Sequence, residues 1–494
     1  MLFNSYGFIL VFLPVVVAGF FLLGRESPGL ASGWLAGASL VFYGLWDWRF
    51  VPLLLASVAF NHGAGKLLAG ALAAGRRRRA RLLLILGVGT DLLLLGGFKY
   101  LPFLAGIFTA VTGRDAGLGR IILPIGISFF TFTQIAYLVD IARGLTRGSG
   151  FVSYLLFVSY FPHLIAGPVL HHGDMMPQFA APATFRPDER AIAVGFTAFI
   201  LGLFKKVALA DQVAPFARAA FVAGGHPGAS LAWAGALAYT LQIYLDFSAY
   251  SDMAIGLSRM LNIRLPANFE SPYKAASIID FWRRWHISLS RFLRDYLYIP
   301  LGGGRRGTGR RYANLLLTMV LGGLWHGAGW TFVLWGGLHG VYLIVNHGWR
   351  HVARHLPPGG RAGRFAGWAL TMLAVILAWV LFRAPDIGTA WAVLCGMAGL
   401  SGAGGALPGG AQEGAVLAAL GIMVLALPNL REVMRGESLV LADPAAPRPA
   451  ALGRMRRLAP RWRPGLLWAG ACAALFAISL LRMTQVSQFL YFQF

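Results

Sequence analysis

Cysteine and charged residues are both scarce in this 494-residue sequence. The two cysteines, Cys395 and Cys472, lie in or beside apolar runs, which excludes a disulfide framework and a CxxC metal or redox site. Only 13% of the residues are charged, whereas 57% are hydrophobic. Because soluble chains of this length carry about twice that charge, the sequence predicts a membrane protein.

Acidic residues are the scarcer charge: 19 Asp and Glu stand against 43 Lys and Arg, a net charge of +24. In a soluble protein this excess would suggest nucleic acid, but cytoplasmic loops of membrane proteins collect Lys and Arg, so no nucleic-acid partner is expected. The amino terminus has no basic residue before Gly7 and no small-residue cleavage site, so it is interpreted as the first membrane helix. We assign to the cytoplasm the clusters Arg76–Arg81, Lys205–Lys206, Arg283–Arg311, Arg350–Arg364 and Arg431–Arg463.

Apolar runs with almost no charge recur along the chain. They predict an all-α integral membrane protein with about 11 spanning helices, because about 20 apolar residues cross a bilayer. The strong runs are Gly7–Leu23, Gly29–Trp46, Ile121–Val139, Phe151–Leu170, Ala191–Phe204, Leu231–Leu245, Tyr312–Val345, Phe365–Phe382, Gly414–Leu430 and Gly465–Leu481; weaker ones are Phe50–Gly63, Leu82–Phe98 and Ile387–Leu407. Leu231–Leu245 separates two clusters that we assign to the same side, so we also expect a re-entrant segment in the second half.

A polar, aromatic segment from Asn262 to Arg311 interrupts these runs. From Ala276 to Tyr296 apolar residues return every three or four positions with arginines between them, which predicts one amphipathic helix in the membrane interface. The next run, Tyr312–Val345, is longer than one crossing needs and has glycines on both sides of His326. We therefore expect a helix that is bent or interrupted at His326, where protein or a cavity must receive the backbone polar groups.

Histidine inside a membrane run is costly to bury without a polar task, so His326 is the favoured functional residue. His286, on the amphipathic segment, fits catalysis and an interfacial contact equally well. His339 and His347 are interpreted mainly as packing residues, and His163 follows a proline in another apolar run, where it would line the same cavity. The HHxD group at residues 171–174 predicts no metal site, because adjacent histidines point apart on regular backbone.

No Walker loop and no GxSxG elbow in a strand-turn-helix context is present in the sequence. What remains is a neutral histidine, with an ordinary pKa of about 6.5, in an enclosed site. Such a base takes a proton from an alcohol as the alcohol attacks an activated acyl group. The neighbouring basic segment Arg283–Arg311 would attract a phosphate-rich acyl donor.

Long strings of the sequence resemble the bacterial branch of the membrane-bound O-acyltransferases (MBOAT). They are "LPIGISFFTFTQIAYLVD" (123–140), "FPHLIAGPV" (161–169), "DFSAYSDMAIGLSRMLNI" (246–263), "NFESPYKAASIIDFWRRWHISLSRFLRDYLYIPLGG" (268–303), "LGGLWHGAGWTFVLWGGLHG" (321–340) and the terminal "FLYFQF". The resemblance implies one polytopic domain over residues 1–494, with N-terminal helices at 1–115, a catalytic core at 119–347 and C-terminal helices at 364–494. It implies a buried tunnel, with the family's two histidines at His326 and His286. The chain departs from the family pattern at Ala267 and Gly304, where Glu and Asn are expected.

The resemblance also implies a function: acetyl groups from cytoplasmic acetyl-CoA are passed across the bacterial inner membrane to a periplasmic partner protein that O-acetylates alginate or an alginate-like exopolysaccharide. No bound cofactor or metal is implied. Peptidoglycan O-acetylation and teichoic acid D-alanylation remain open as alternatives. A proton-coupled transporter is the alternative of another class, although the paired broken helices of inverted repeats are not visible in the sequence.

The expected roles follow from that reading. His326 would be the general base or a transient acyl carrier, and His286 would position donor or acceptor. Trp282, Trp285, Trp325 and Trp330 would wall the site or serve only as packing aromatics. Arg283, Arg284 and Arg291 would hold the donor's phosphates or lipid headgroups.

Overall fold

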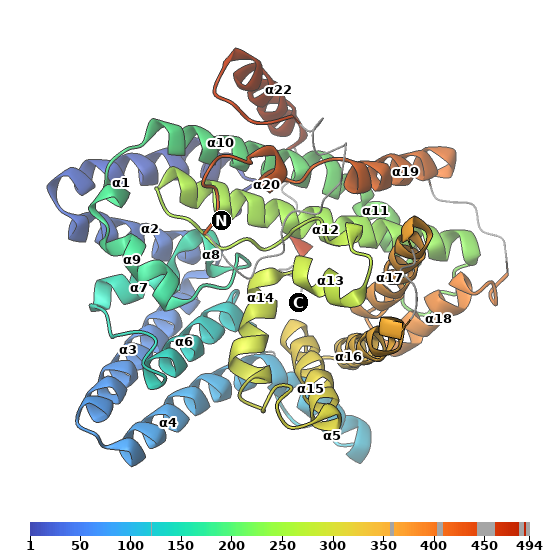
Figure 1. Cartoon of the computed structure of the whole chain (residues 1–494), viewed down its shortest axis with the longest axis horizontal. Helices are drawn as coiled ribbons and strands as arrows, with labels where there is room; N and C mark the ends of the chain where they lie inside the picture. The colour runs from blue at the N-terminus through green and yellow to red at the C-terminus, as the bar shows by residue number, and fades with distance from the viewer. Residues whose placement is uncertain (120, 356–359, 403–408, 442–459, 484–488, 491–494) are drawn as a thin grey trace. The chain divides into compact units, whose positions relative to one another are not determined.

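The computed structural model describes residues 1–119, 121–355, 360–402, 409–441, 460–483 and 489–490 (Figure 1). The described residues form helices and no named strand. They group into two compact units: one is Met1–Ile200 with Ser251–Pro266 and Leu439–Leu441, and the other is Leu201–Tyr250, Ala267–Ser438 and Ala442–Phe494. The predicted run Ile387–Leu407, the last two basic clusters and the terminal FLYFQF string extend into residues outside the described part.

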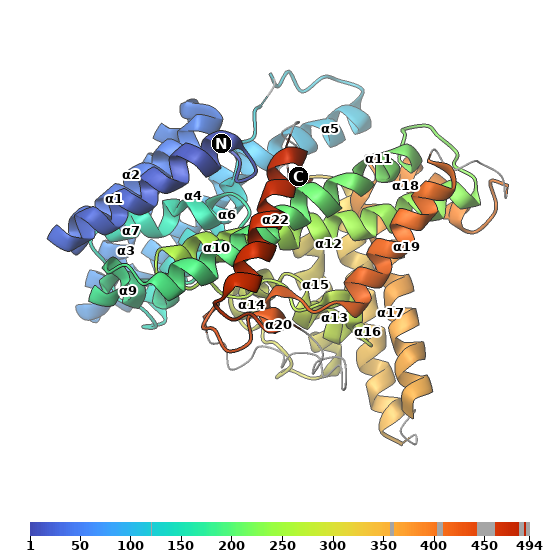
Figure 2. The same ribbon diagram turned by 90° about the horizontal axis from the view of Figure 1, so that it is seen from above.

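The first unit contains the N-terminal helices. Figure 2 shows its first two long helices, α1 and α2, lying side by side. In chain order its elements are η1 (Phe8–Phe12), α1 (Leu13–Glu26), α2 (Pro28–Asp47), η2 (Trp48–Phe50), α3 (Val51–Ala73), α4 (Arg77–Leu95), η3 (Gly96–Tyr100), α5 (Leu101–Thr112), α6 (Ile127–Ala142), α7 (Phe151–Ser159), α8 (Phe161–Leu164), α9 (His172–Ala180), η4 (Pro182–Phe185) and the first part of α10 (Glu189–Phe204).

The second unit holds both predicted catalytic histidines. Within it α16 and α17 run side by side (Figure 2). After the end of α10 its elements are η5 (Lys205–Ala210), α11 (Asp211–Ala220), α12 (Ala229–Met260, to Tyr250), η6 (Pro272–Lys274), α13 (Ile278–Arg284), α14 (Ile287–Leu293), η7 (Arg294–Tyr298), α15 (Thr308–His326), α16 (Trp330–Val352), η8 (Ala353–His355), α17 (Gly360–Arg383), α18 (Ile387–Met397), α19 (Gly410–Ala426), α20 (Leu430–Val433) and α22 (Leu466–Arg482).

Several helices have the length and composition of membrane spans. Among the described residues five helical segments are long and apolar enough to cross a bilayer: Phe8–Glu26, Pro28–Ala73, Arg77–Thr112, Glu189–Ala220 and Gly360–Arg383. Four shorter apolar helices accompany them. The chain is thus all-helical with a multi-pass membrane character, while the predicted number of about 11 spans stays a prediction.

Lys205 and Lys206, predicted as one of the basic clusters, lie within a helix. They do not form a loop cluster, because they lie inside the continuous helical segment Glu189–Ala220. Lys206 is buried, with Nζ 2.6 Å from Asp246 Oδ1 and 2.9 Å from Asp211 Oδ1. A buried charge needs such partners, so Lys206 is an interior ion-pair residue. The cytoplasmic assignment of this cluster and the re-entrant segment next to Leu231–Leu245 stay predictions.

The pair α15 and α16 carries the quoted glycine-rich run. Small residues let two helix backbones approach closely, and a Cβ added at Gly336 would lie 2.3 Å from the carbonyl oxygen of Met319. Helix α15 ends at His326 and α16 begins at Trp330. Only glycine fits at this break, because a Cβ at Gly327 would overlap the ring of Phe332. The predicted interruption at His326 is therefore confirmed.

Candidate active site

The structure brings His286 and His326 together. Forty positions apart in sequence, their ring centroids lie 6.3 Å apart, and their exposed fractions are 0% and 5%. His286 stands at the start of α14, and His326 is the last residue of α15. Two imidazoles at this separation are close enough to contact one acyl group and its accepting hydroxyl, whose reacting atoms need to approach to about 3–3.5 Å.

The backbone at His286 corrects the predicted amphipathic helix. In place of one helix from Ala276 to Tyr296, α13 ends at Arg284 and α14 starts at Ile287, with the link between them in non-helical conformations. His286 has φ 44° and ψ 55°, a left-handed conformation that is uncommon for any residue except glycine. Such strain costs about 1–3 kcal/mol and persists where the surroundings over-determine it, often at functional sites. Here it turns the imidazole into the interior of the unit.

Aromatic rings enclose both histidines. The ring centroid of His326 lies 4.9 Å from Trp325, 5.2 Å from Trp335 and 5.2 Å from Phe382. The ring of Phe247 stands edge-on to His286 at 4.8 Å. An apolar enclosure of this kind excludes water, which strengthens every electrostatic interaction within it and protects an activated acyl group from hydrolysis. Burial also lowers the pKa of His286 to about 3, so its imidazole is neutral at physiological pH.

The four predicted tryptophans have different surroundings. Trp325 is buried beside both histidines, 6.1 Å from His286 between ring centroids. Trp285 is buried in a stack with Phe281 and Trp379, at 5.7 and 4.9 Å. The indole of Trp282 donates to Nδ1 of His339 over 3.2 Å. Trp330, in contrast, is 53% exposed at the start of α16.

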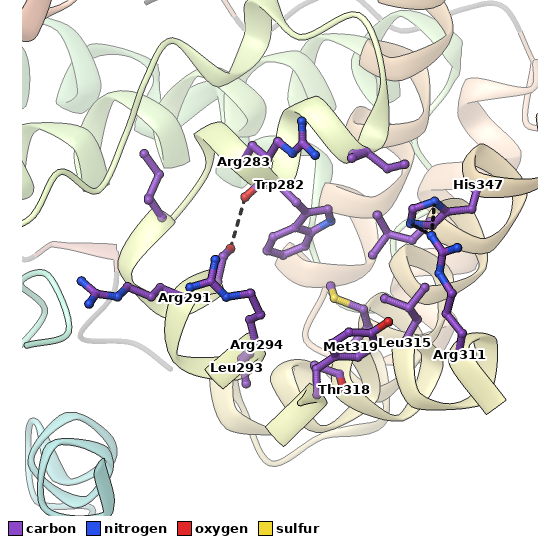
Figure 3. A pocket seen from close by; sticks show the side chains of 15 residues that line it. Trp282, Arg283, Arg291, Leu293, Arg294, Arg311, Leu315, Thr318, Met319 and His347 are labelled. Atoms are coloured by element: carbon purple, nitrogen blue, oxygen red, sulfur yellow. Dashed lines mark hydrogen bonds between the residues drawn. The ribbon is translucent and has the colours of Figure 1, made fainter. Parts of the chain in front are cut away.

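A cationic pocket lies on the same helices. Its volume is about 480 Å³, and Figure 3 shows its walls from α13, α14, η7, α15 and α16. Four arginines line it together with His347: Arg283, Arg291, Arg294 and Arg311. Asp295 is the acidic neighbour of two of them, 3.9 Å from Arg291 and 2.7 Å from Arg294. The pocket therefore keeps an excess of positive charge for an anionic group.

The pocket is adjacent to the histidines along the chain. Trp282 and Ile287, which line it, flank His286 on α13 and α14. Met319, on its α15 wall, precedes His326 by seven residues, or about 10 Å at the helical rise of about 1.5 Å per residue. A bulky anionic group in the pocket thus lies within the length of a flexible arm from the imidazoles.

Two predicted binding residues are placed elsewhere. The guanidinium of Arg284 is buried, 2.9 Å from Asp280 Oδ1 and 3.3 Å from the carbonyl oxygen of Glu270, and it does not line the pocket. His163 belongs to the first unit, where its Nε2 lies 3.0 Å from the carbonyl oxygen of Phe157. Their predicted contact with substrate stays untested.

Three residues that line the pocket, Arg294, Arg311 and His347, were not among the binding residues predicted from the sequence. Nη2 of Arg311 donates to Nδ1 of His347 over 2.7 Å, across the α15–α16 pair. Arg294 and Arg311 fall in the basic segment that the sequence singles out, but their common direction depends on the break at His286 and on the fold of residues 299–307. The sequence therefore indicated that these arginines belong to a basic segment, but nothing in it indicated that their side chains line the same pocket.

Comparisons with known proteins identify the family of this chain. The sequence model described as MBOAT, membrane-bound O-acyltransferase family, matches residues 127–385, which include both histidines and the pocket. The chain belongs to the membrane-bound O-acyltransferase family. It is 41% identical to a probable alginate O-acetylase AlgI of Pseudomonas aeruginosa, with 100% of each chain covered. It is 42% identical to a peptidoglycan O-acetyltransferase of Helicobacter pylori over 81% of this chain and 80% of the relative.

A more distant relative is a teichoic acid D-alanyltransferase of Streptococcus thermophilus, 26% identical over 51% of this chain and 63% of that protein. As an MBOAT protein the chain is an acyltransferase that uses an acyl donor. Its enclosed histidine pair beside a cationic pocket has the chemical groups that such a transfer needs: a proton acceptor and a place for a charged donor.

Proposed function

We propose that this MBOAT protein moves acetyl groups from cytoplasmic acetyl-CoA across the inner membrane for O-acetylation of an extracytoplasmic polysaccharide, alginate or an alginate-like exopolysaccharide. The observation that supports it most is the meeting of His286 and His326 at 6.3 Å inside an aromatic enclosure, next to a pocket with four arginines. The division into helices 1–115, core 119–347 and helices 364–494 is part of the proposal, as is relay through a periplasmic partner.

The reaction assigns a task to each part. His326 accepts the proton of the attacking hydroxyl as its oxygen bonds to the acetyl carbonyl carbon. The carbon–sulfur bond then breaks, and the thiolate of coenzyme A takes up the proton. In a variant of this scheme, the ring nitrogen of His326 first attacks the acetyl carbonyl carbon and forms a transient acetyl-imidazole, which then passes the acetyl group to the hydroxyl. His286 positions the acyl group or the hydroxyl across the 6.3 Å gap.

The arginine pocket is proposed as the donor site. Coenzyme A carries a diphosphate and a 3′-phosphate, and guanidinium groups bind phosphates through paired hydrogen bonds. Basic residues concentrate on the cytoplasmic side of membrane proteins, where acetyl-CoA is made. Arg283, Arg291, Arg294 and Arg311 provide more positive charge than Asp295 offsets.

Relatives favour alginate as the acceptor class. Two proteins described as probable alginate O-acetylases, from Pseudomonas aeruginosa and Azotobacter vinelandii, are 41% and 40% identical over the full length of both chains. The peptidoglycan relative has similar identity over a shorter alignment, so peptidoglycan O-acetylation is the second candidate. D-alanylation is disfavoured by 26% identity over half of the chain.

The test is acetyl transfer by the purified protein in vesicles that contain its partner and glycan, with radiolabelled acetyl-CoA outside. His326→Ala is expected to lower the rate about 10²–10⁴-fold, the usual contribution of a general base. His351→Ala is the matched control, because His351 is exposed on α16 away from the pocket lining, and its rate stays within twofold. A folded His326→Ala variant that acetylates as fast as the parent would refute the assignment, and substrate flux without acetylation would favour a transporter.

The donor site has its own test. Arg283→Ala is expected to raise KM for acetyl-CoA about tenfold with little change in kcat, since a hydrogen bond to a charged group contributes about 1.5–3 kcal/mol. Arg310→Ala is the control, because Arg310 is exposed and does not line the pocket. Equal KM values for both variants would exclude the pocket as the donor site.

A further inference from the structure

The side chain of Asn268 contacts a ring nitrogen of His286. Its Oδ1 lies 3.0 Å from Nδ1 of His286 and accepts a hydrogen bond from the hydroxyl of Ser288 over 2.9 Å. The exposed fractions of Asn268, His286 and Ser288 are 1%, 0% and 3%. The contact is therefore buried, where a polar pair is strong and a mismatched one is costly.

The chemistry of this contact fixes which imidazole nitrogen carries the proton. A carboxamide oxygen only accepts hydrogen bonds, so Nδ1 must be the donor. In a neutral imidazole one nitrogen is protonated and the other carries the lone pair. With Nδ1 protonated by this constraint, the lone pair is on Nε2.

We propose that Asn268 is a positioning residue, which holds His286 in the Nδ1–H tautomer so that Nε2 presents its lone pair to the bound substrates during acyl transfer. This inference rests on the proposed function for its catalytic consequence. The proposal places a lone pair of His286 beside the general base His326. It also accounts for the left-handed backbone at His286. The strain aims the ring at an acceptor that regular helix would not reach.

Two backbone hydrogen bonds hold the Asn268 segment against the helix break. The amide of Ile287 donates to the carbonyl of Asn268 over 2.9 Å, and the amide of Glu270 donates to the carbonyl of Arg284 over 3.0 Å. These bonds join Asn268 to the residue after His286 and Glu270 to the last residue of α13, before His286. The two backbone hydrogen bonds therefore hold the side chains of Asn268 and His286 opposite each other.

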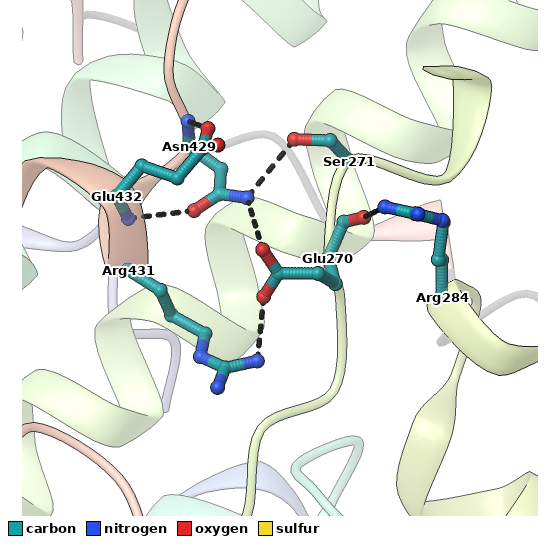
Figure 4. A network of polar contacts seen from close by, with 6 residues as sticks. All are labelled: Glu270, Ser271, Arg284, Asn429, Arg431 and Glu432. Atoms are coloured by element: carbon teal, nitrogen blue, oxygen red, sulfur yellow. Dashed lines mark hydrogen bonds and ion pairs between the residues drawn. The ribbon is translucent and has the colours of Figure 1, made fainter. Parts of the chain in front are cut away.

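An ionic cluster fastens the far side of the same segment (Figure 4). The carboxylate of Glu270, 1% exposed, lies 2.5 Å from Nη1 of Arg431 and 3.1 Å from Nδ2 of Asn429. Asn429 also donates to the hydroxyl of Ser271 over 2.9 Å. The loop that carries Asn268 is thus attached to α20. Partners that orient a metal-bound histidine affect activity about 10–100-fold, and we expect the same order for the partner of His286.

The kinetic experiment compares Asn268→Asp and Asn268→Leu in the vesicle assay. Asn268→Asp keeps the acceptor and adds a negative charge beside Nδ1–H, which raises the pKa of His286. Because Nε2 of His286 has a lone pair only while the imidazole is neutral, the acidic limb of the pH–rate profile moves to higher pH by at least about one unit, with activity retained above it. Asn268→Leu removes the acceptor, so kcat falls about 10–100-fold while KM for acetyl-CoA stays within twofold.

The matched control is Asn314→Leu. Asn314 is equally buried, at 2% exposed, and its amide donates to the carbonyls of Leu301 and Gly303 over 3.2 and 3.0 Å. Its loss lowers stability but leaves the acidic limb where it is in the parent. An unshifted limb in Asn268→Asp, or an unchanged kcat in Asn268→Leu, would overturn the inference while leaving the proposed function intact.

A second readout needs no substrate. Nitrogen-15 NMR of histidine-labelled protein, with the His286 signals assigned from their loss in His286→Gln, is expected to show a protonated Nδ1 and an unprotonated Nε2. A protonated Nε2 would overturn the inference. A parent that transfers no acetyl group at all would overturn the proposed function and the catalytic role given to Nε2, whereas the tautomer would still be decided by the spectrum.

Discussion

Arg431→Ala is the sharpest test of the ionic cluster behind the site. Glu270 is almost fully buried, and the guanidinium of Arg431 is its only cationic partner in hydrogen-bonding contact among the described residues. Removing that side chain leaves the carboxylate with the single amide hydrogen bond from Asn429. A buried charge without its partner is expensive, so the folded state should lose stability.

The magnitude follows from burial. Breaking a fully buried ion pair by removing one partner costs about 3–5 kcal/mol. The side chain of Arg431 is 23% exposed, so water will reach the space it leaves and hydrate Glu270 in part, which reduces the expected loss to about 2–3 kcal/mol. The same change should lower kcat, because the loop that carries Asn268 loses its attachment to α20.

The loss depends on pH with a defined sign. Burial raises the pKa of Glu270 in the parent, and Arg431 opposes that rise; without the guanidinium the pKa rises further. A group with a raised folded pKa contributes stability below its unfolded pKa and loses it as pH rises through the folded value. The destabilisation of Arg431→Ala is therefore smaller at pH 5 than at pH 8.

The assay is thermal unfolding in detergent micelles at both pH values. Glu270→Gln combined with Arg431→Ala removes the buried charge and keeps a hydrogen-bonding group, so it should recover more than half of the lost stability and show little pH dependence. If Arg431→Ala unfolds at the parent's temperature at pH 8, or if the double variant is as unstable as the single one, the reasoning is refuted.

Two further changes test the interior of the second unit. Gly336→Val should abolish folding of the α15–α16 pair and all activity, because its Cβ would lie 2.3 Å from the carbonyl of Met319, whereas Gly337→Ala, with its nearest atom at 3.9 Å, should express and acetylate like the parent. Lys206→Met should cost about 3 kcal/mol by leaving Asp246 without its lysine partner. Adding Asp246→Asn should restore part of the unfolding temperature, and a double variant no better than Lys206→Met would contradict the ionic explanation.

Local patterns were sufficient for several features. Hydropathy and charge predicted the helical membrane class, since any 20-residue apolar run must satisfy its backbone as helix in lipid. The glycines around His326 predicted the end of α15, because the requirement is local: at position 327 only glycine avoids overlap with the ring of Phe332. Long sequence strings such as those at residues 268–303 and 321–340 resemble the MBOAT family, and the comparisons confirm that the chain belongs to it.

Other features depended on contacts that no local pattern contains. The run from Ala276 to Tyr296 has continuous helical periodicity, yet the chain breaks at His286, where pairing with the Asn268 segment outweighs helix propensity. Lys206 has the sequence appearance of a loop lysine, whereas its burial and its partners Asp211 and Asp246 show that it is interior.

The sequence by itself determined that this is an all-helical membrane acyltransferase with a glycine-broken helix at His326, because composition, periodicity and motif are properties of neighbouring residues. Only the tertiary structure decided that His286 meets His326, that Asn268 contacts Nδ1 of His286, and that arginines from η7 and α15 converge on one pocket. Those facts arise from distances between segments far apart in the chain, and such distances are fixed by packing.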